Sequence, residues 1–151
     1  MKYYLLLFCC ILVSACTAPS SSLNYADAEI GEPNDERAVV VVYRKMVAPI
    51  LYPVSVHLET TKKASLPNNS FTWFYAVPGT NEIRFKWPAL TLQPGSKQQV
   101  EFTAGNTYYI EFKSNMGFSS VAYVVNSSGV ADEKLAKDEL KECCKYIQAT
   151  P

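Results

Sequence analysis

Two adjacent cysteines, Cys143 and Cys144, form the least ordinary pair of chemically active side chains in the sequence. Adjacent side chains on a helix diverge by about 100°, so a disulfide between them would break a helix locally. Three interpretations remain open. Cys143 is a small buried apolar residue beside a more exposed Cys144, or Cys144 forms an intermolecular disulfide, or the pair has a redox or metal role. A Cys-x-x-Cys redox pair would have a different spacing.

His57 is the only histidine, and its setting argues against catalysis and metal binding. It alternates with Val56 and Leu58 in a strand-like stretch, which predicts an exposed side chain. No second imidazole is present to build a zinc site, and no Gly-x-Ser-x-Gly motif marks a nucleophile. The glutamates of the predicted strands alternate with apolar residues, as solvent-facing positions do; they are Glu59, Glu82, Glu101 and Glu111. We therefore expect no enzymatic activity, no metal and no catalytic residue.

The N-terminus has the organisation of a signal peptide. Lys2 precedes an unbroken apolar run over residues 3–13. About eleven residues are too few for a transmembrane helix, which needs about 20, but they suit the core of a signal peptide. The run ends in Val13-Ser14-Ala15-Cys16, in which small residues precede a cysteine.

This tetrapeptide resembles the lipobox of bacterial lipoproteins. The resemblance implies cleavage between Ala15 and Cys16 and acylation of Cys16, with palmitate or a similar chain as the only non-protein group. Thr17 follows the cysteine, where Asp would imply retention in the inner membrane. The resemblance therefore implies an outer-membrane anchor on the periplasmic face, with the inner membrane as the alternative.

The charge balance excludes nucleic acid as an expected partner. The chain has 14 basic and 14 acidic residues, and removal of residues 1–15 takes away only Lys2, which leaves a net charge of −1. No basic excess remains to neutralise phosphates, and no polybasic patch is present to bind anionic lipids.

Composition divides the chain into four parts. Residues 1–15 are the predicted signal peptide. Residues 16–37 are dominated by small and acidic residues without periodicity, which predicts a lipidated cysteine followed by a flexible tether. Residues 38–126 are predicted to form a β-sandwich domain, and residues 127–151 a helix that docks on it.

The strand pattern predicts a mainly β fold, an antiparallel β-sandwich of about seven or eight strands with one C-terminal α-helix. The β-branched run 39–43 predicts a strand covered on both faces. Residues 71–77 and 82–87, joined by Pro78-Gly79, predict the clearest hairpin, and residues 118–125 predict the last strand.

The helix is predicted from a change to helical periodicity after residue 129. Asp132 and Glu133 precede it with charges that suit a helix N-terminus. One apolar stripe is expected to face the sandwich, made of Ala136, Leu140, Cys143 and Ile147.

Several short motifs follow one another along the middle of the chain: Val42-Tyr43-Arg44, Val56-His57-Leu58, Leu66, Ser70-Phe71, Pro78-Gly79 and Gly105-Asn106-Thr107-Tyr108-Tyr109. In this order the segment 41–109 resembles a bacterial family known as a domain of unknown function, numbered 2846, which has the rhythm of PEGA-like small β-sandwiches. The resemblance implies a lipoprotein and no assigned chemistry. Asn81 stands where a His commonly follows the Pro-Gly turn, so a function of that His would be missing.

Large aromatic side chains provide the remaining binding candidates. Tyr52, Trp73, Trp87 and Tyr109 form a candidate binding surface if they are exposed, and part of an ordinary core if they are not. The sequence therefore predicts a non-enzymatic interaction or structural module of the bacterial envelope, with another envelope protein as partner. The alternative is a lipoprotein that binds glycans or small molecules through exposed aromatic residues.

Overall fold

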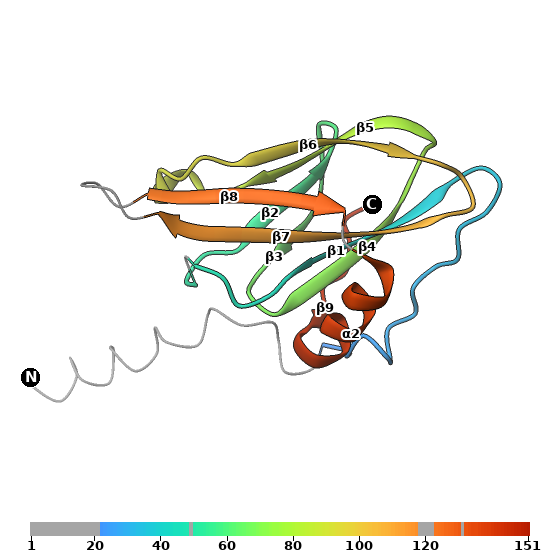
Figure 1. Cartoon of the computed structure of the whole chain (residues 1–151), viewed down its shortest axis with the longest axis horizontal. Coiled ribbons are helices and arrows are strands. Elements are labelled where there is room, and N and C mark those ends of the chain that lie inside the picture. The colour runs from blue at the N-terminus through green and yellow to red at the C-terminus, as the bar shows by residue number, and fades with distance from the viewer. Residues whose placement is uncertain (1–21, 49, 118–122, 131) are drawn as a thin grey trace, which may run out of the picture.

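Two β-sheets stacked face to face make up the domain in the computed structural model, which describes residues 22–48, 50–117, 123–130 and 132–151. In chain order the elements are β1 (Ala38–Arg44), β2 (Val54–Leu58), β3 (Thr61–Leu66), β4 (Ser70–Ala76), β5 (Gly79–Lys86), the short 3-10 helix η2 (Ala89–Thr91), β6 (Ser96–Phe102), β7 (Thr107–Gly117), β8 (Tyr123–Val130), α2 (Glu133–Cys143) and β9 (Lys145–Tyr146). The first sheet has the order β8-β7-β1-β4-β9 and the second β3-β2-β5-β6 (Figure 1). The predicted mainly β sandwich with one C-terminal helix is confirmed.

The strands of the sandwich are mostly antiparallel, with two exceptions in the first sheet. β1 pairs with β7 in parallel, and β4 pairs with β9 in parallel. Both parallel pairs join segments that are far apart in the sequence. Short-range alternation cannot reveal such pairs, because a parallel neighbour needs a long crossover connection.

β1 is the central strand, and all seven of its residues are buried. Val40 and Val42 point into the core between the two sheets, while Val39 and Val41 point to the opposite face. A strand buried on both faces has a continuous β-branched sequence rather than an alternating one. The prediction for residues 39–43 is therefore confirmed.

The core between the sheets is built from aliphatic residues and a ring cluster. Phe85 and Phe112 stack at 4.8 Å between centroids, and Trp87 meets Phe112 edge to face at 5.6 Å. The buried residues of this core are Ala38, Val40, Val42, Val54, Val56, Ala64, Leu66, Phe74, Ala76, Ile83, Phe85, Trp87, Val100, Phe102, Ile110 and Phe112.

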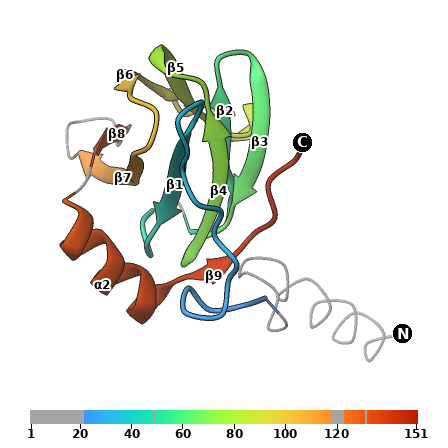
Figure 2. The ribbon, with the colours of Figure 1, turned by 90° about the vertical axis from the view of Figure 1, so that its right-hand side faces the viewer.

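A second apolar layer covers the outer face of the five-stranded sheet. α2 contributes Ala136 and Leu140 to this layer, and residues 22–37 contribute Tyr25, Ala28 and Ile30 (Figure 2). Residues 22–37, predicted as part of a flexible tether, instead lie against the sheet. Their composition is small and polar, but the few apolar side chains among them pack on aromatic residues that the sheet leaves uncovered.

The predicted hairpin over residues 71–77 and 82–87 is wrong. β4 pairs with β1 and β9, whereas β5 pairs with β2 and β6. The Pro78-Gly79 turn therefore connects one sheet to the other instead of joining two hydrogen-bonded neighbours. Gly79 has a φ of 111°, as the sequence of the turn suggests, but turn chemistry alone does not say which sheet the next strand joins.

The helix is shorter than the predicted segment 127–151. β8 continues to Val130, and α2 begins at Glu133, where the Asp132 side chain accepts a hydrogen bond from the Leu135 amide at 3.1 Å. Of the predicted last strand, residues 118–122 lie outside the described residues. After α2 the chain returns to the first sheet as β9, and Ile147 and Ala149 pack against the core between the sheets.

Candidate functional site

Two of the four aromatic residues predicted as a binding surface are buried. Trp87 is 8% exposed within the core between the sheets, and Tyr109 is 5% exposed beneath α2. Tyr52 is partly buried and packs against the inner core. The four side chains belong to two separate apolar layers, so they do not form one surface.

Trp73 is partly buried because the N-terminal segment crosses it. Its ring meets Tyr75 edge to face at 5.4 Å, and the Arg37 guanidinium lies 3.9 Å from the centre of the Tyr75 ring. Gly31 approaches both rings so closely that a β-carbon there would collide with the Tyr75 hydroxyl and the Trp73 ring. These aromatic residues hold residues 31–37 on the sheet, which is a structural role. The basis for the predicted aromatic binding surface is therefore lost.

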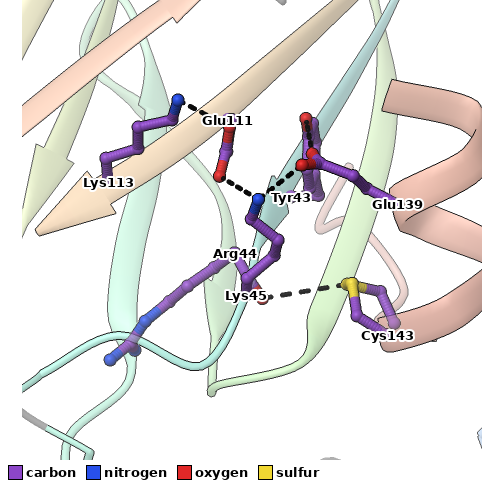
Figure 3. A network of polar contacts seen from close by, with 8 residues as sticks. Tyr43, Arg44, Lys45, Glu111, Lys113, Glu139 and Cys143 are labelled. Carbon is purple, nitrogen blue, oxygen red and sulfur yellow. Dashed lines mark hydrogen bonds and ion pairs between the residues drawn. A yellow bond between two sulfur atoms is a disulfide. The ribbon is translucent and has the colours of Figure 1, made fainter. Parts of the chain in front are cut away.

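A network of ion pairs and hydrogen bonds lies where α2 meets β1 and β7 (Figure 3). The Lys45 ammonium is 2.5 Å from Glu139 Oε1 and 3.0 Å from Glu111 Oε1. The Tyr43 hydroxyl donates to Glu139 Oε2 at 2.8 Å, and Lys113 lies 3.1 Å from Glu111 Oε2. We call these five side chains the helix clamp.

Strand periodicity explains why these residues converge. Tyr43 lies on the face of the sheet that α2 covers, and Lys45, two residues further along, continues on that side. The parallel register places Glu111 beside Tyr43. Glu139 comes from α2, next to buried Leu140. A carboxylate beside the apolar stripe is the signal that sequence reasoning missed.

The contacts of the clamp raise the pKa values of Lys45 and Tyr43 and lower the pKa of Glu139. Burial lowers the pKa of Lys45, but the ion pairs with Glu139 and Glu111 outweigh burial and raise that pKa above its usual value. Burial raises the pKa of Tyr43, and its hydrogen bond to Glu139 raises it further. Burial alone would raise the pKa of Glu139, but the bonds from Lys45 and Tyr43 hold it below its usual range. These are the properties of a fixed ion-pair network, since a nucleophilic lysine or a general base needs shifts of the opposite sign.

Two of the strand glutamates predicted to face solvent are buried. Glu111 is 6% exposed in the clamp, and Glu82 is 8% exposed. Glu82 forms an ion pair with Arg84 and lies 3.8 Å from Lys97. Alternation predicts the face of a strand correctly, but it does not show that a lysine from another part of the sheet, Lys45 for Glu111 and Lys97 for Glu82, lies close to the carboxylate.

Cys143 and Cys144 are joined in a disulfide. The predicted intermolecular thiol at Cys144 is not found, because Cys144 is 4% exposed and bonded to its neighbour. The helix ends at Cys143, and Cys144 is already extended with φ −120° and ψ 137°. The bridge therefore lies at the junction of α2 and β9, where it does not need to fit inside a helix. The Cys144 sulfur lies 3.9 Å from the Arg44 carbonyl oxygen.

Arg44 is a fully buried cation that sequence reasoning did not single out. One guanidinium nitrogen donates to the carbonyls of Tyr52 at 2.8 Å and Leu66 at 3.0 Å, and the other donates to Val47 at 3.2 Å. Its guanidinium carbon lies 4.9 Å from the centre of the Trp87 ring. Burial lowers the pKa of Arg44 to about 10, so it stays charged at neutral pH.

His57 is half-buried rather than exposed as predicted. Burial lowers its pKa, and the nearby charge of Lys86 lowers it further. Within the described ranges, no three His, Cys, Asp or Glu side chains gather as metal ligands would. None of the helices in the described part of the chain has the length and apolar character needed to span a bilayer. Ala15 and Cys16 lie outside the described residues.

No protein-family model, curated protein or solved structure matches the chain. The resemblance to the family of unknown function numbered 2846 therefore stays a prediction.

Proposed function

We propose that the protein is a lipid-anchored component of the bacterial envelope. The observation that carries this proposal is the tetrapeptide Val13-Ser14-Ala15-Cys16 at the end of the apolar run 3–13. In this proposal, residues 1–15 are removed, Cys16 carries the lipid, and the protein remains on the periplasmic face of the outer membrane.

The domain acts as a non-enzymatic interaction or structural module that contacts another envelope protein. Two features of the described residues support this role. The clamp residues with shifted pKa values are engaged with one another rather than directed at an open site. β1, the strand that leads into the clamp, is covered on both faces, so its side chains stabilise the fold.

Replacement of Cys16 tests the anchor directly. Cys16→Ala should abolish incorporation of a labelled acyl chain and release the protein from the membrane fraction. Cys10→Ala is the matched control, because it changes a cysteine in the apolar run and leaves the tetrapeptide intact. Unchanged acylation and membrane partition of Cys16→Ala would overturn the proposal.

Crosslinking in intact envelopes tests the partner. A stoichiometric crosslinked protein, recovered with wild type and lost with Cys16→Ala, is the expected result. Recovery of the same partner at the same yield with the unanchored variant would show that the anchor does not bring the two together.

A further inference from the structure

Two loops at one end of the sandwich are uncharged and rich in large apolar residues. Between Lys45 and Val54, and again between Lys86 and Ser96, the sequence contains no charged residue. Five large apolar side chains of these loops are exposed, and we call them the apolar tip. The residues of the apolar tip are Met46, Ile50, Leu51, Leu90 and Leu92.

The strand register places both loops at the same end. β2 and β5 are antiparallel neighbours, with Ser55 opposite Lys86. The loop that precedes β2 and the loop that follows β5 therefore leave the sheet side by side. Figure 1 shows the connections before β2 and after β5 at the same end of the sandwich.

The exposure of the apolar tip is extensive. Leu51 is 62% exposed, Leu90 81% and Leu92 92%. A single exposed leucine is ordinary, but several on neighbouring loops mark a surface that another apolar body covers.

Buried polar side chains hold the first loop in place. Arg44 binds the carbonyls of Val47 and Tyr52. Asn68, 2% exposed, accepts from the Val47 amide at 3.1 Å and donates to the Ile50 carbonyl at 3.3 Å. The loop is therefore preformed, although the side chains of Met46, Ile50 and Leu51 stay more than half exposed.

The second loop holds Leu92 in an unfavourable conformation. Leu92 has a φ of 51°, in the left-handed region that a leucine rarely adopts. The Thr91 amide and hydroxyl both donate to the Pro88 carbonyl, at 3.0 and 2.8 Å, which fixes the turn. Neither backbone preference nor internal packing favours leucine at this position, which points to a contact outside the domain.

The described chain starts near the same end. Asn24 forms a β-bridge with Lys145 of β9, and Lys145 pairs with Ser70 of β4. Ser70 in turn lies opposite Arg44, the last residue of β1, after which the first loop begins. Ser22 is the sixth residue after Cys16, and a fully extended chain of that length reaches only about 20 Å. A lipid on Cys16 would keep this end of the sandwich close to the bilayer surface.

The opposite end of the sandwich has a different character. Its turns carry the exposed charged residues Asp35, Glu36 and Glu59. The turn at residues 34–37 is fixed there, because the Gly105 amide donates to the Asn34 carbonyl at 2.8 Å. The turns at one end of the sandwich therefore carry exposed charges, whereas the two loops at the other end are uncharged and expose apolar side chains.

We propose that the apolar tip inserts into the interface of the lipid bilayer to which the protein is anchored. The inference rests on the proposed lipid anchor and adds a second contact with the same membrane. Leucine, isoleucine and methionine side chains enter the boundary between headgroups and acyl chains, as in other peripheral membrane proteins. The second contact fixes the orientation of the domain, with the charged end directed away from the bilayer.

Site-specific fluorescence tests the proposal on the acylated full-length protein in vesicles of phosphatidylethanolamine and phosphatidylglycerol. A polarity-sensitive dye is attached at Leu92→Cys and, as the matched control, at Val77→Cys, with signal from the unsubstituted protein subtracted. Val77 is 67% exposed and follows β4 at the opposite end. Quenching by a nitroxide-labelled lipid should be at least about threefold stronger at position 92 than at position 77.

A second pair of variants tests whether the quenching at position 92 depends on the apolar side chains of the tip. Leu51→Asp with Leu90→Asp should reduce quenching at position 92 to the level at position 77, whereas Glu59→Gln should leave it unchanged. Circular dichroism should show the same fold in all variants, because the replaced side chains are exposed.

Equal quenching at both positions, in protein that is acylated and floats with the vesicles, would overturn the inference and leave the anchor proposal intact. Absence of acylation at Cys16 would overturn the anchor proposal itself. A blue shift at position 92 that requires an envelope protein, or that grows with protein concentration without vesicles, would assign the apolar tip to a protein partner or a second copy and overturn the inference.

Discussion

Consecutive cations at the end of β1 are stabilised in two different ways. Arg44 points inward, where three backbone carbonyls and the face of Trp87 surround it. Lys45 points outward, where two carboxylates bind it. The planar guanidinium can serve several carbonyls at once, whereas the compact ammonium suits paired carboxylates. Exchange of these two residue types would therefore leave both sites poorly satisfied.

Glu139→Gln should reveal the contribution of the helix clamp through its pH dependence. The pKa of Glu139 is depressed in the folded protein, so its stabilisation is present above the ordinary carboxyl pKa and is lost as the pH falls through the depressed value. We expect the variant to lose about 0.5–1.5 kcal/mol of unfolding free energy at neutral pH. The difference from wild type should vanish in acid. Denaturant titrations at several pH values measure it.

Glu142→Gln is the control for this prediction, because Glu142 lies on the same helix and is exposed. It should change stability little at any pH. A loss in Glu139→Gln that is equally large at neutral and acid pH would show that charge at position 139 is not the cause.

The disulfide predicts the thiol content of the mature protein. Cys143 and Cys144 are joined within one chain, so thiol titration of denatured, unreduced protein should detect neither of them. Non-reducing gels should show a monomer. Two titratable thiols, or a covalent dimer that Cys144→Ser removes, would contradict the bridge.

At the scale of elements, the outer face of the five-stranded sheet depends on two segments from opposite ends of the chain. Residues 22–37 cover Trp73 and Tyr75, and α2 covers Val39, Val41 and Tyr109. Tyr25 of the N-terminal segment reaches Tyr109, and the two hydroxyl oxygens lie 3.4 Å apart. The Tyr146 amide also donates to the Leu23 carbonyl at 2.8 Å, so the N-terminal segment is part of the domain from Leu23 onward.

Ile30→Asp should loosen the N-terminal segment. Ile30 packs against the outer apolar layer, and a carboxylate there loses burial and gains no described partner. We expect a loss of about 1–3 kcal/mol in unfolding free energy. Tryptophan emission should shift to the red, because the Trp73 ring becomes more exposed to water. Exposed Glu29→Gln is the matched control. An unchanged emission spectrum in Ile30→Asp would mean that the segment does not cover Trp73 in solution.

At the scale of the whole molecule, the C-terminal segment closes one open side of the sandwich. The Ile147 amide donates to the Phe71 carbonyl of β4 at 2.7 Å, and the Thr150 amide donates to the Lys63 carbonyl of β3 at 2.6 Å. The segment thus passes from one sheet to the other and covers strand edges that would otherwise be open to other chains.

Ile147→Asp should therefore destabilise the domain and promote self-association. Ile147 packs against the core between the sheets, whereas the next residue, Gln148, is exposed. We expect Ile147→Asp to lose about 1–3 kcal/mol and to scatter more light on storage. Gln148→Asp should do neither. Equal behaviour of the two variants would show that the segment does not protect the edges.

Local sequence determined the class of the fold and the elements with strong patterns. The β-branched run in β1, the apolar residues Ala136 and Leu140 of α2, and the turn at Pro78-Gly79 each follow from side-chain size, branching or backbone preference within a few residues. The proposed anchor at Cys16 also belongs to the sequence alone, because a peptidase and acyl transferases would read a short peptide.

Tertiary structure alone decided the partners of these elements. It placed β5 in the other sheet, buried Trp87 and Tyr109, brought Glu139 to Lys45, and joined Cys143 to Cys144 at a helix end. Apart from the disulfide between the adjacent residues Cys143 and Cys144, each outcome depends on contacts between residues far apart in the chain, and such contacts are set by how whole layers pack. Alternation and turn chemistry act over a few residues, so they could not reveal which surface is covered, which charge is paired, or that two separate loops with exposed leucines lie at the same end.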